Sequence, residues 1–205
     1  MPPDTRIRIV EAAMRLFGEQ GYAGTTIAEI ERAAGLSAGS GAVYRHFPSK
    51  EAILDAGITH AIASSTDLAA LLQSAGLQAQ PLRDRLCAVA RAGLRRLEDE
   101  RDLNRLVLRD LGRFPDLLAR VGREEMSRTM TAVSRWLRAQ GDAVQSADVD
   151  WDAVAMVLMG AVTHFWILRD TFGEHPAGLS EERLIDAAVS LAAAAMTGGP
   201  GKEQR

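Results

Sequence analysis

Hydroxyl, cationic and small side chains are concentrated between Gly35 and Lys50, in the stretch GLSAGSGAVYRHFPSK. Serine, tyrosine, arginine and lysine side chains donate hydrogen bonds to phosphate oxygens. Glycine lets a backbone come close to a partner because it carries no side chain. The stretch also contains no acidic side chain that would repel a polyanion. Its chemistry therefore suits contact with phosphate groups.

Three short helices are the elements that must position these side chains. Helical periodicity predicts the first over residues 5–20. The second begins at Thr26, where Glu29 completes a capping box, and a third is predicted over residues 42–47. Two helices joined by a glycine-containing turn, here at about residues 26–47, are the layout of a helix-turn-helix DNA-binding motif. The sequence therefore predicts a DNA-binding head.

The second and third helices should each pack against the rest of the head through apolar side chains. The buried stripe of the second helix is predicted to be Ile27, Ile30, Ala33 and Ala34, with Gly35 ending the helix. Val43 and Phe47 lie four positions apart and are expected to anchor the third helix.

The rest of the chain also has a helical period, and no segment alternates as a strand. A fourth helix is predicted from residue 49 to about residue 74, and a turn region follows at 74–81. Further helices are expected at about 82–98, 103–113, 116–140, 150–172 and 180–196. The fold class is therefore all-α with about nine helices. We expect a DNA-binding head at residues 1–50, a larger helical body at 51–205, and disorder in the tail 198–205.

Composition restricts the classes of partner. The net charge of the 205 residues is −3, and residues 1–50 carry six Lys and Arg against five Asp and Glu, a balance of +1. A non-specific DNA-architectural protein needs a larger cationic surface. The longest uncharged stretch, residues 153–168, has 16 residues, fewer than the roughly 20 of a membrane span, and is expected to be a buried helix. Charged residues interrupt any N-terminal signal, so we expect a cytoplasmic protein without a membrane partner.

The N-terminal part of the chain, roughly residues 5–60, resembles the TetR family of bacterial transcriptional regulators. The resemblance is carried by IVEAA and LF in the first helix, GY, TTI and AG around the second, and YRHFPSKE after the turn. It implies a homodimeric repressor that binds a palindromic double-stranded DNA operator and is released by a small apolar or amphipathic effector. One feature departs from the family pattern. Ser37 and Tyr44 are seven positions apart, two more than in the usual turn.

On this basis the DNA-contacting residues are predicted around two helix starts and the turn. The set is Thr25, Thr26, Ser37, Ser40, Gly41, Ala42, Tyr44, Arg45, His46 and Lys50. Thr25 and Thr26 could instead serve only as helix caps, and Lys50 could be a solvated surface lysine. Arg45 could contact either a guanine edge or a phosphate. The longer turn leaves open which residues face the bases.

Two further sites are predicted in the body. The effector pocket is expected to use thioether and aromatic side chains, which adapt to irregular apolar ligands: Met126, Met130, Trp136, Met156, Met159, His164 and Trp166. The dimer interface is expected along the last two helices: Trp151, Leu158, Val162, Phe165, Leu184, Ala188 and Leu191. Ordinary core packing is the alternative for both sets.

Other chemistry finds little support in the sequence. The segment DVDWD at 148–152 begins like a calcium loop but lacks the glycine and glutamate that such a loop needs, so acidic capping of a helix start explains it better. The histidines lack metal-ligand spacing, and no cofactor or metal is expected. A helical enzyme acting on an apolar small molecule remains the alternative function, although no nucleophile–base pair supports it.

Overall fold

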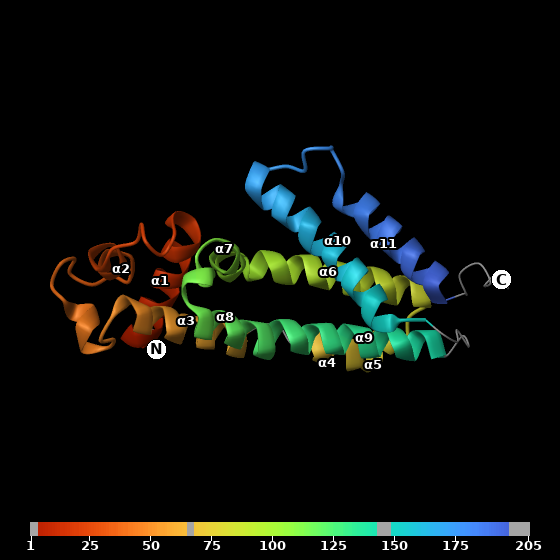
Figure 1. The fold of residues 1–205 in the computed structure, drawn as a ribbon, viewed down its shortest axis with the longest axis horizontal. Coiled ribbons are helices and arrows are strands. Elements are labelled where there is room, and N and C mark those ends of the chain that lie inside the picture. The colour runs from red at the N-terminus through yellow and green to blue at the C-terminus, as the bar shows by residue number, and fades with distance from the viewer. Residues whose placement is uncertain (1–3, 65–67, 143–148, 197–205) are drawn as a thin grey trace. The chain divides into compact units, whose positions relative to one another are not determined.

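Every regular element in the described part of the chain is a helix (Figure 1). The computed structural model describes residues 4–64, 68–142 and 149–196. The predicted all-α class is confirmed, whereas the tail 198–205, for which disorder was expected, lies outside the described residues. The chain folds as two compact units that interleave in sequence. The first unit comprises residues 1–65 and 100–125, and the second comprises residues 66–99 and 126–205.

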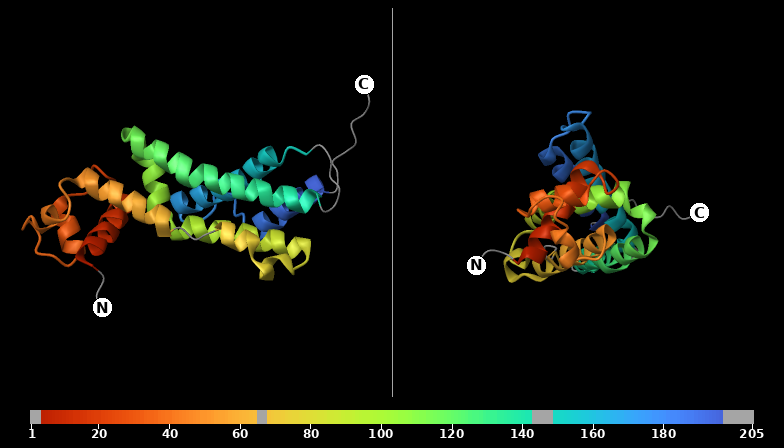
Figure 2. Two further views of the ribbon diagram at one scale, coloured as in Figure 1. Left: turned by 90° about the horizontal axis from the view of Figure 1, so that it is seen from below. Right: turned by 90° about the vertical axis from the view of Figure 1, so that its left-hand side faces the viewer.

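The first unit contains the three predicted short helices, the helix that follows them, and three segments from later in the chain. Its elements are α1 (Thr5–Gln20), α2 (Ile27–Ala33), the 3-10 helix η1 (Ala42–Arg45), α3 (Lys50–Ser64), α7 (Arg101–Arg109), the 3-10 helix η2 (Leu111–Arg113) and α8 (Pro115–Val121). Figure 2 shows α1 in red beside the start of α3 in orange. Helix α1 also packs against α7. The head therefore shares one core with residues 100–125.

Polar contacts fix both the first and the last turn of α1. Asp4 accepts a hydrogen bond from the backbone of Arg6 at the start of the helix. At its end, Arg109 of α7 donates to the carbonyls of Phe17 and Gly18. The buried Asp110 pairs with Arg109 and accepts from the Tyr22 N–H. Because the Gly18 carbonyl is one that a helix end leaves unpaired, its hydrogen bond from Arg109 helps α7 to hold α1 in place.

Helices α1 and α7 approach so closely at Gly18 that no side chain fits there. A Cβ at this position would lie 2.7 Å from the Cα of Asp102. Gly18→Ala is therefore expected to lower the free energy of unfolding by about 1–3 kcal/mol, because overpacking against backbone outweighs the helix propensity of alanine. Gly93→Ala is the matched control, since a Cβ there would lie 3.7 Å from Val162. Urea unfolding should show no loss of stability for that control, and equal stability of both variants would contradict the packing.

The second unit is a helical body. Its helices are α4 (Leu68–Gln73), α5 (Ala75–Gln78), α6 (Leu82–Asp99), α9 (Ser127–Asp142), α10 (Trp151–Phe172) and α11 (Glu181–Met196). A π-helical turn, η3 (Gly122–Met126), precedes α9. In Figure 1, α10 and α11 run side by side, and α10 also packs against α6 and α9. The Asp150 carboxylate caps α10 by accepting from two backbone N–H groups, as expected for an acid at a helix start.

Several predicted elements differ in detail from the structure. The helix predicted over 103–113 ends at Arg109 and is followed by η2, and the helix predicted over 49–74 is described as α3 and α4. The third helix is a single 3-10 turn, because two left-handed glycines lie immediately before it. The segment predicted as one helix over 116–140 is interrupted by the π turn η3. The segment expected as a turn contains the short helix α5, which Ser74 caps. None of these differences changes the all-α architecture.

Candidate nucleic-acid interface

The start of α2 is capped by its own side chains. Thr26 Oγ1 accepts from the Glu29 N–H at 3.3 Å, and Glu29 Oε2 accepts from the Thr26 N–H at 2.7 Å. The predicted capping box is therefore confirmed. The hydrogen bonds from Thr26 lower the pKa of the Glu29 carboxyl below its usual value. Thr26 is exposed, whereas Thr25 is buried and donates its hydroxyl to the Gly21 carbonyl at 2.8 Å.

The turn between α2 and η1 contains three glycines with positive φ, of which Gly35 (71°) follows α2 and two lie near η1. Gly39 and Gly41 have φ angles of 74° and 69°, in the left-handed region that other residues rarely occupy. Ser37 and Ser40 are exposed, and the Ser40 hydroxyl accepts from the Ala42 N–H at 3.2 Å. The longer turn is thus an ordered surface that presents hydroxyl groups.

The 3-10 helix η1 has an anchored face and an exposed face. Val43 and Phe47 are buried in the core of the head, as their spacing predicted. Tyr44 is 57% exposed, and Arg45 is also exposed. These two side chains are the largest polar groups that the turn and η1 present to a partner. Ala42 is buried, which prevents direct contact with a base edge.

Lys50 is held by the head itself. Its Nζ donates to the Tyr22 carbonyl at 2.7 Å and to the Thr25 carbonyl at 2.8 Å. The ammonium also lies 4.3 Å from the centre of the Tyr22 ring. Burial lowers the pKa of Lys50 below its usual value. Lys50 therefore ties the start of α3 to the segment between α1 and α2, and two of its three donors are already used.

Two further residues of the head escaped sequence reasoning. Arg6 donates to the His46 carbonyl at 2.9 Å and stacks 4.2 Å from the centre of the Phe47 ring. Glu31 is buried and accepts hydrogen bonds from the turn. A signal for Glu31 was present, because positions 27, 30, 31 and 34 form a helical stripe that includes it. Ala33, predicted to be buried, is exposed instead.

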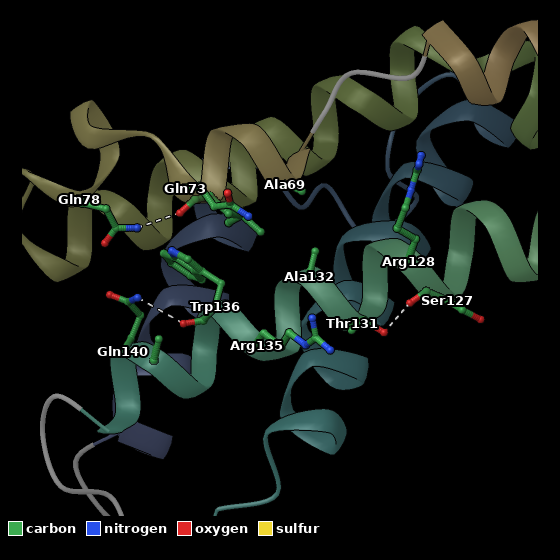
Figure 3. A pocket seen from close by; sticks show the side chains of 12 residues that line it. Ala69, Gln73, Gln78, Ser127, Arg128, Thr131, Ala132, Arg135, Trp136 and Gln140 are labelled. Atoms are coloured by element: carbon green, nitrogen blue, oxygen red, sulfur yellow. Dashed lines mark hydrogen bonds between the residues drawn. The ribbon is translucent and has the colours of Figure 1, made fainter.

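A groove in the second unit lies between α4, the segment after it, and α9 (Figure 3). Its volume is 800 Å³. The lining residues are Ala69, Leu72, Gln73, Gln78, Ser127, Arg128, Thr131, Ala132, Arg135, Trp136, Ala139 and Gln140. Trp136 lies on the side of α9 that faces Gln73 and Gln78. The groove combines apolar walls with two arginines.

Of the seven predicted pocket residues, Trp136 alone lines this groove. Met126, Met156 and His164 are exposed, and Met130 and Met159 pack against the core of the second unit. Trp166 is buried and donates its indole N–H to Glu98 Oε2 at 3.2 Å. The structure therefore does not bring the predicted set together.

Six of the seven predicted interface residues belong to the core of the second unit or pack against it, and one lies on the surface. Trp151, Phe165, Leu184 and Ala188 are buried in the chain's own core, and Leu158 and Val162 pack against it. Leu191 is exposed. The other face of α10 exposes Ala153, Met156, Val157, Gly160, Ala161 and His164, and α11 exposes Ala187 beside Leu191.

The apolar helix α10 was expected to be buried, but only one of its faces is. By length and composition it could cross a membrane, and only 22% of its most apolar window is buried. Its other face exposes a continuous apolar surface. Within residues 4–64, 68–142 and 149–196, no group of three His, Cys, Asp or Glu side chains could hold a metal ion.

The head matches a known family of DNA-binding proteins. Residues 9–56 match the model for bacterial regulatory proteins of the tetR family. The chain is 44% identical over 50 residues to the HTH-type transcriptional repressor AcnR of Corynebacterium glutamicum. This local match spans 24% of the chain and 26% of AcnR.

Over the whole chain, the sequence identity to known proteins is lower than in the head, but the similarity of the fold is clear. The chain is 25% identical to the uncharacterized HTH-type transcriptional regulator YvkB of Bacillus subtilis over 187 residues, which span 91% of this chain and 94% of YvkB. A crystal structure described as a TetR-family transcriptional regulator from Mesorhizobium loti superposes with a TM-score of 0.71 at 22% identity, covering 94% of this chain and 95% of that one.

Proposed function

Because this chain is a TetR-family transcriptional regulator, we propose that it acts as a homodimeric repressor. Two copies bind one palindromic operator, and a small molecule bound by the C-terminal body releases them. The observation that carries this proposal is the pair of exposed side chains Tyr44 and Arg45 on a helix anchored by Val43 and Phe47. In this arrangement η1 presents hydrogen-bond donors to phosphate oxygens and base edges, while its apolar side packs against the core of the head.

The apolar face of α10 and α11 supports assembly into a dimer. Met156 and Val157 of α10 and Leu191 of α11 are each more than three-fifths exposed. Around them lie Ala153, Gly160, Ala161 and Ala187, which are small enough to let two helices approach closely. A second copy would cover this face with the same face of its own, since a two-fold axis makes an interface self-complementary. We call these seven residues the dimer face.

A dimer places two heads on one duplex. Heads separated by about 34–36 Å, one turn of B-DNA, would enter successive major grooves of a palindromic site. An effector that favours another separation weakens binding to both half-sites together. A coupling of about 1–3 kcal/mol between the two sites suffices for such regulation.

The groove between α4 and α9 is the proposed effector site. Leu72, Ala132 and Trp136 give it apolar walls, whereas Arg128 and Arg135 bring positive charge to its lining. This composition suits an amphipathic molecule with an apolar body and an anionic or acceptor group. Residues 1–50 are thus assigned to DNA binding and residues 51–205 to effector binding and dimerisation, in a protein of the cytoplasm.

Arg45→Ala tests the proposed DNA interface. Its affinity for operator DNA, measured by fluorescence anisotropy, is expected to fall by about 1–3 kcal/mol because an exposed cation on η1 is removed. If Arg45 contacts a base, its loss relaxes the sequence preference at one position of the operator. If it contacts a phosphate, its loss lowers the slope of log affinity against log salt concentration by about one. Arg138→Ala, which removes an exposed arginine of α9, serves as the control. Unchanged affinity of the Arg45 variant would contradict this interface.

A further inference from the structure

Glu31 is a fully buried acidic side chain in α2, 0% exposed. Its Oε2 accepts a hydrogen bond from the Gly39 N–H at 2.6 Å, and its Oε1 accepts from the Val43 N–H at 3.3 Å. The first donor belongs to the long turn, and the second belongs to η1. One carboxylate therefore connects α2, the turn and the helix that carries Tyr44 and Arg45.

Burial makes these two hydrogen bonds strong determinants of local structure. A carboxylate withdrawn from water is costly unless it is hydrogen-bonded. The two backbone N–H groups need an acceptor as well, because they lie where no regular helix or sheet supplies one. The observed conformation of the turn meets both requirements.

The length of the turn explains why it needs such a support. Two residues more than the usual family turn increase the number of conformations that folding must exclude. Gly39 and Gly41, both at left-handed φ, add flexibility in the unfolded turn. A buried acceptor beneath the turn selects one conformation from this larger set.

We propose that Glu31 is a positioning residue for DNA recognition, which holds the lengthened turn and thereby fixes the direction of Tyr44 and Arg45. The role rests on the proposed DNA-binding function. Glu31 does not touch the DNA, since its side chain is buried beneath the turn. It sets the specificity of binding by keeping the exposed side chains of η1 in register with the bases.

Glu31→Gln tests this role with nearly the same side-chain volume. A glutamine at this position keeps one acceptor and presents an NH₂ group in place of the other, so one of the two N–H groups loses its partner. We expect the ratio of operator to random-DNA affinity to fall about tenfold. Glu11→Gln removes the same charge from an exposed position on α1 and should leave this ratio unchanged.

Amide hydrogen exchange gives a readout that does not depend on DNA. Gly39 and Val43 amides should exchange faster in Glu31→Gln than in the wild type and in Glu11→Gln. Glu31→Asp keeps the charge but shortens the side chain, and it provides the same comparison if the glutamine variant does not fold. Equal exchange, or an unchanged affinity ratio while the wild type discriminates its operator, would overturn the role of Glu31. Failure of the wild type itself to discriminate any DNA would instead refute the proposed function.

Discussion

Val157→Glu is expected to convert the dimer into monomers and to lower operator affinity by about a hundredfold or more. Val157 is 63% exposed at the centre of the dimer face, next to Met156 on α10. A carboxylate there would be buried against its own copy in the partner, and two desolvated like charges oppose association. A monomer binds one half-site only, which removes the gain in affinity that two linked heads provide.

Sedimentation equilibrium measures the assembly state, and anisotropy measures the affinity for the operator. Leu108→Glu is the matched control, because Leu108 of α7 is also 63% exposed and lies outside the dimer face. The control should remain dimeric and bind DNA as the wild type does. A dimeric Val157→Glu protein would show that another surface holds the two copies together.

Lys50→Met is expected to destabilise the protein by about 1.5–3 kcal/mol, the value of a hydrogen bond to a charged group. Methionine keeps the apolar stem of the side chain but removes the ammonium that binds the Tyr22 and Thr25 carbonyls. The contact with the Tyr22 ring is lost as well. The connection between α1 and α2 would keep the hydrogen bonds from the Tyr22 N–H to Asp110 and from the Thr25 hydroxyl to the Gly21 carbonyl.

The same variant separates two roles of Lys50. A lysine that only contacts phosphate would change DNA affinity and its salt dependence while leaving stability intact. Urea unfolding of Lys50→Met should show the loss, whereas Arg45→Ala should unfold like the wild type although it binds DNA more weakly. Unchanged stability of Lys50→Met would mean that its two hydrogen bonds contribute nothing to the fold.

The local signals of the head were strong enough to predict its helices from sequence. The capping box at Thr26 and Glu29 located the start of α2, and Val43 and Phe47 identified the buried side of η1. The prediction for α2 missed Glu31 because apolar residues were assumed to fill the whole stripe. The carboxylate can occupy a core position because backbone N–H groups of Gly39 and Val43, in the turn that follows α2 and in η1, satisfy it, and the helical period of α2 alone does not show this.

The two faces of α10 were harder to predict. The helix is apolar nearly all round, so periodicity does not distinguish the face packed on α6 and α9 from the exposed face. The α10 residues predicted to form the dimer interface, Trp151, Leu158, Val162 and Phe165, lie on the inward face instead, and the proposed dimer face lies on the other side. The residues that line the groove could not be predicted from the sequence for a related reason. The lining of the groove depends on how α4 and α9 meet, which no local pattern encodes.

Operator binding is best tested by sequencing the genomic DNA fragments that the purified protein retains. A dimeric operator-binding regulator should enrich a small number of fragments that share a palindrome, with half-sites about one helical turn apart. Addition of the effector should release them. Retention of fragments without a common sequence, in proportion to their abundance, would contradict the account.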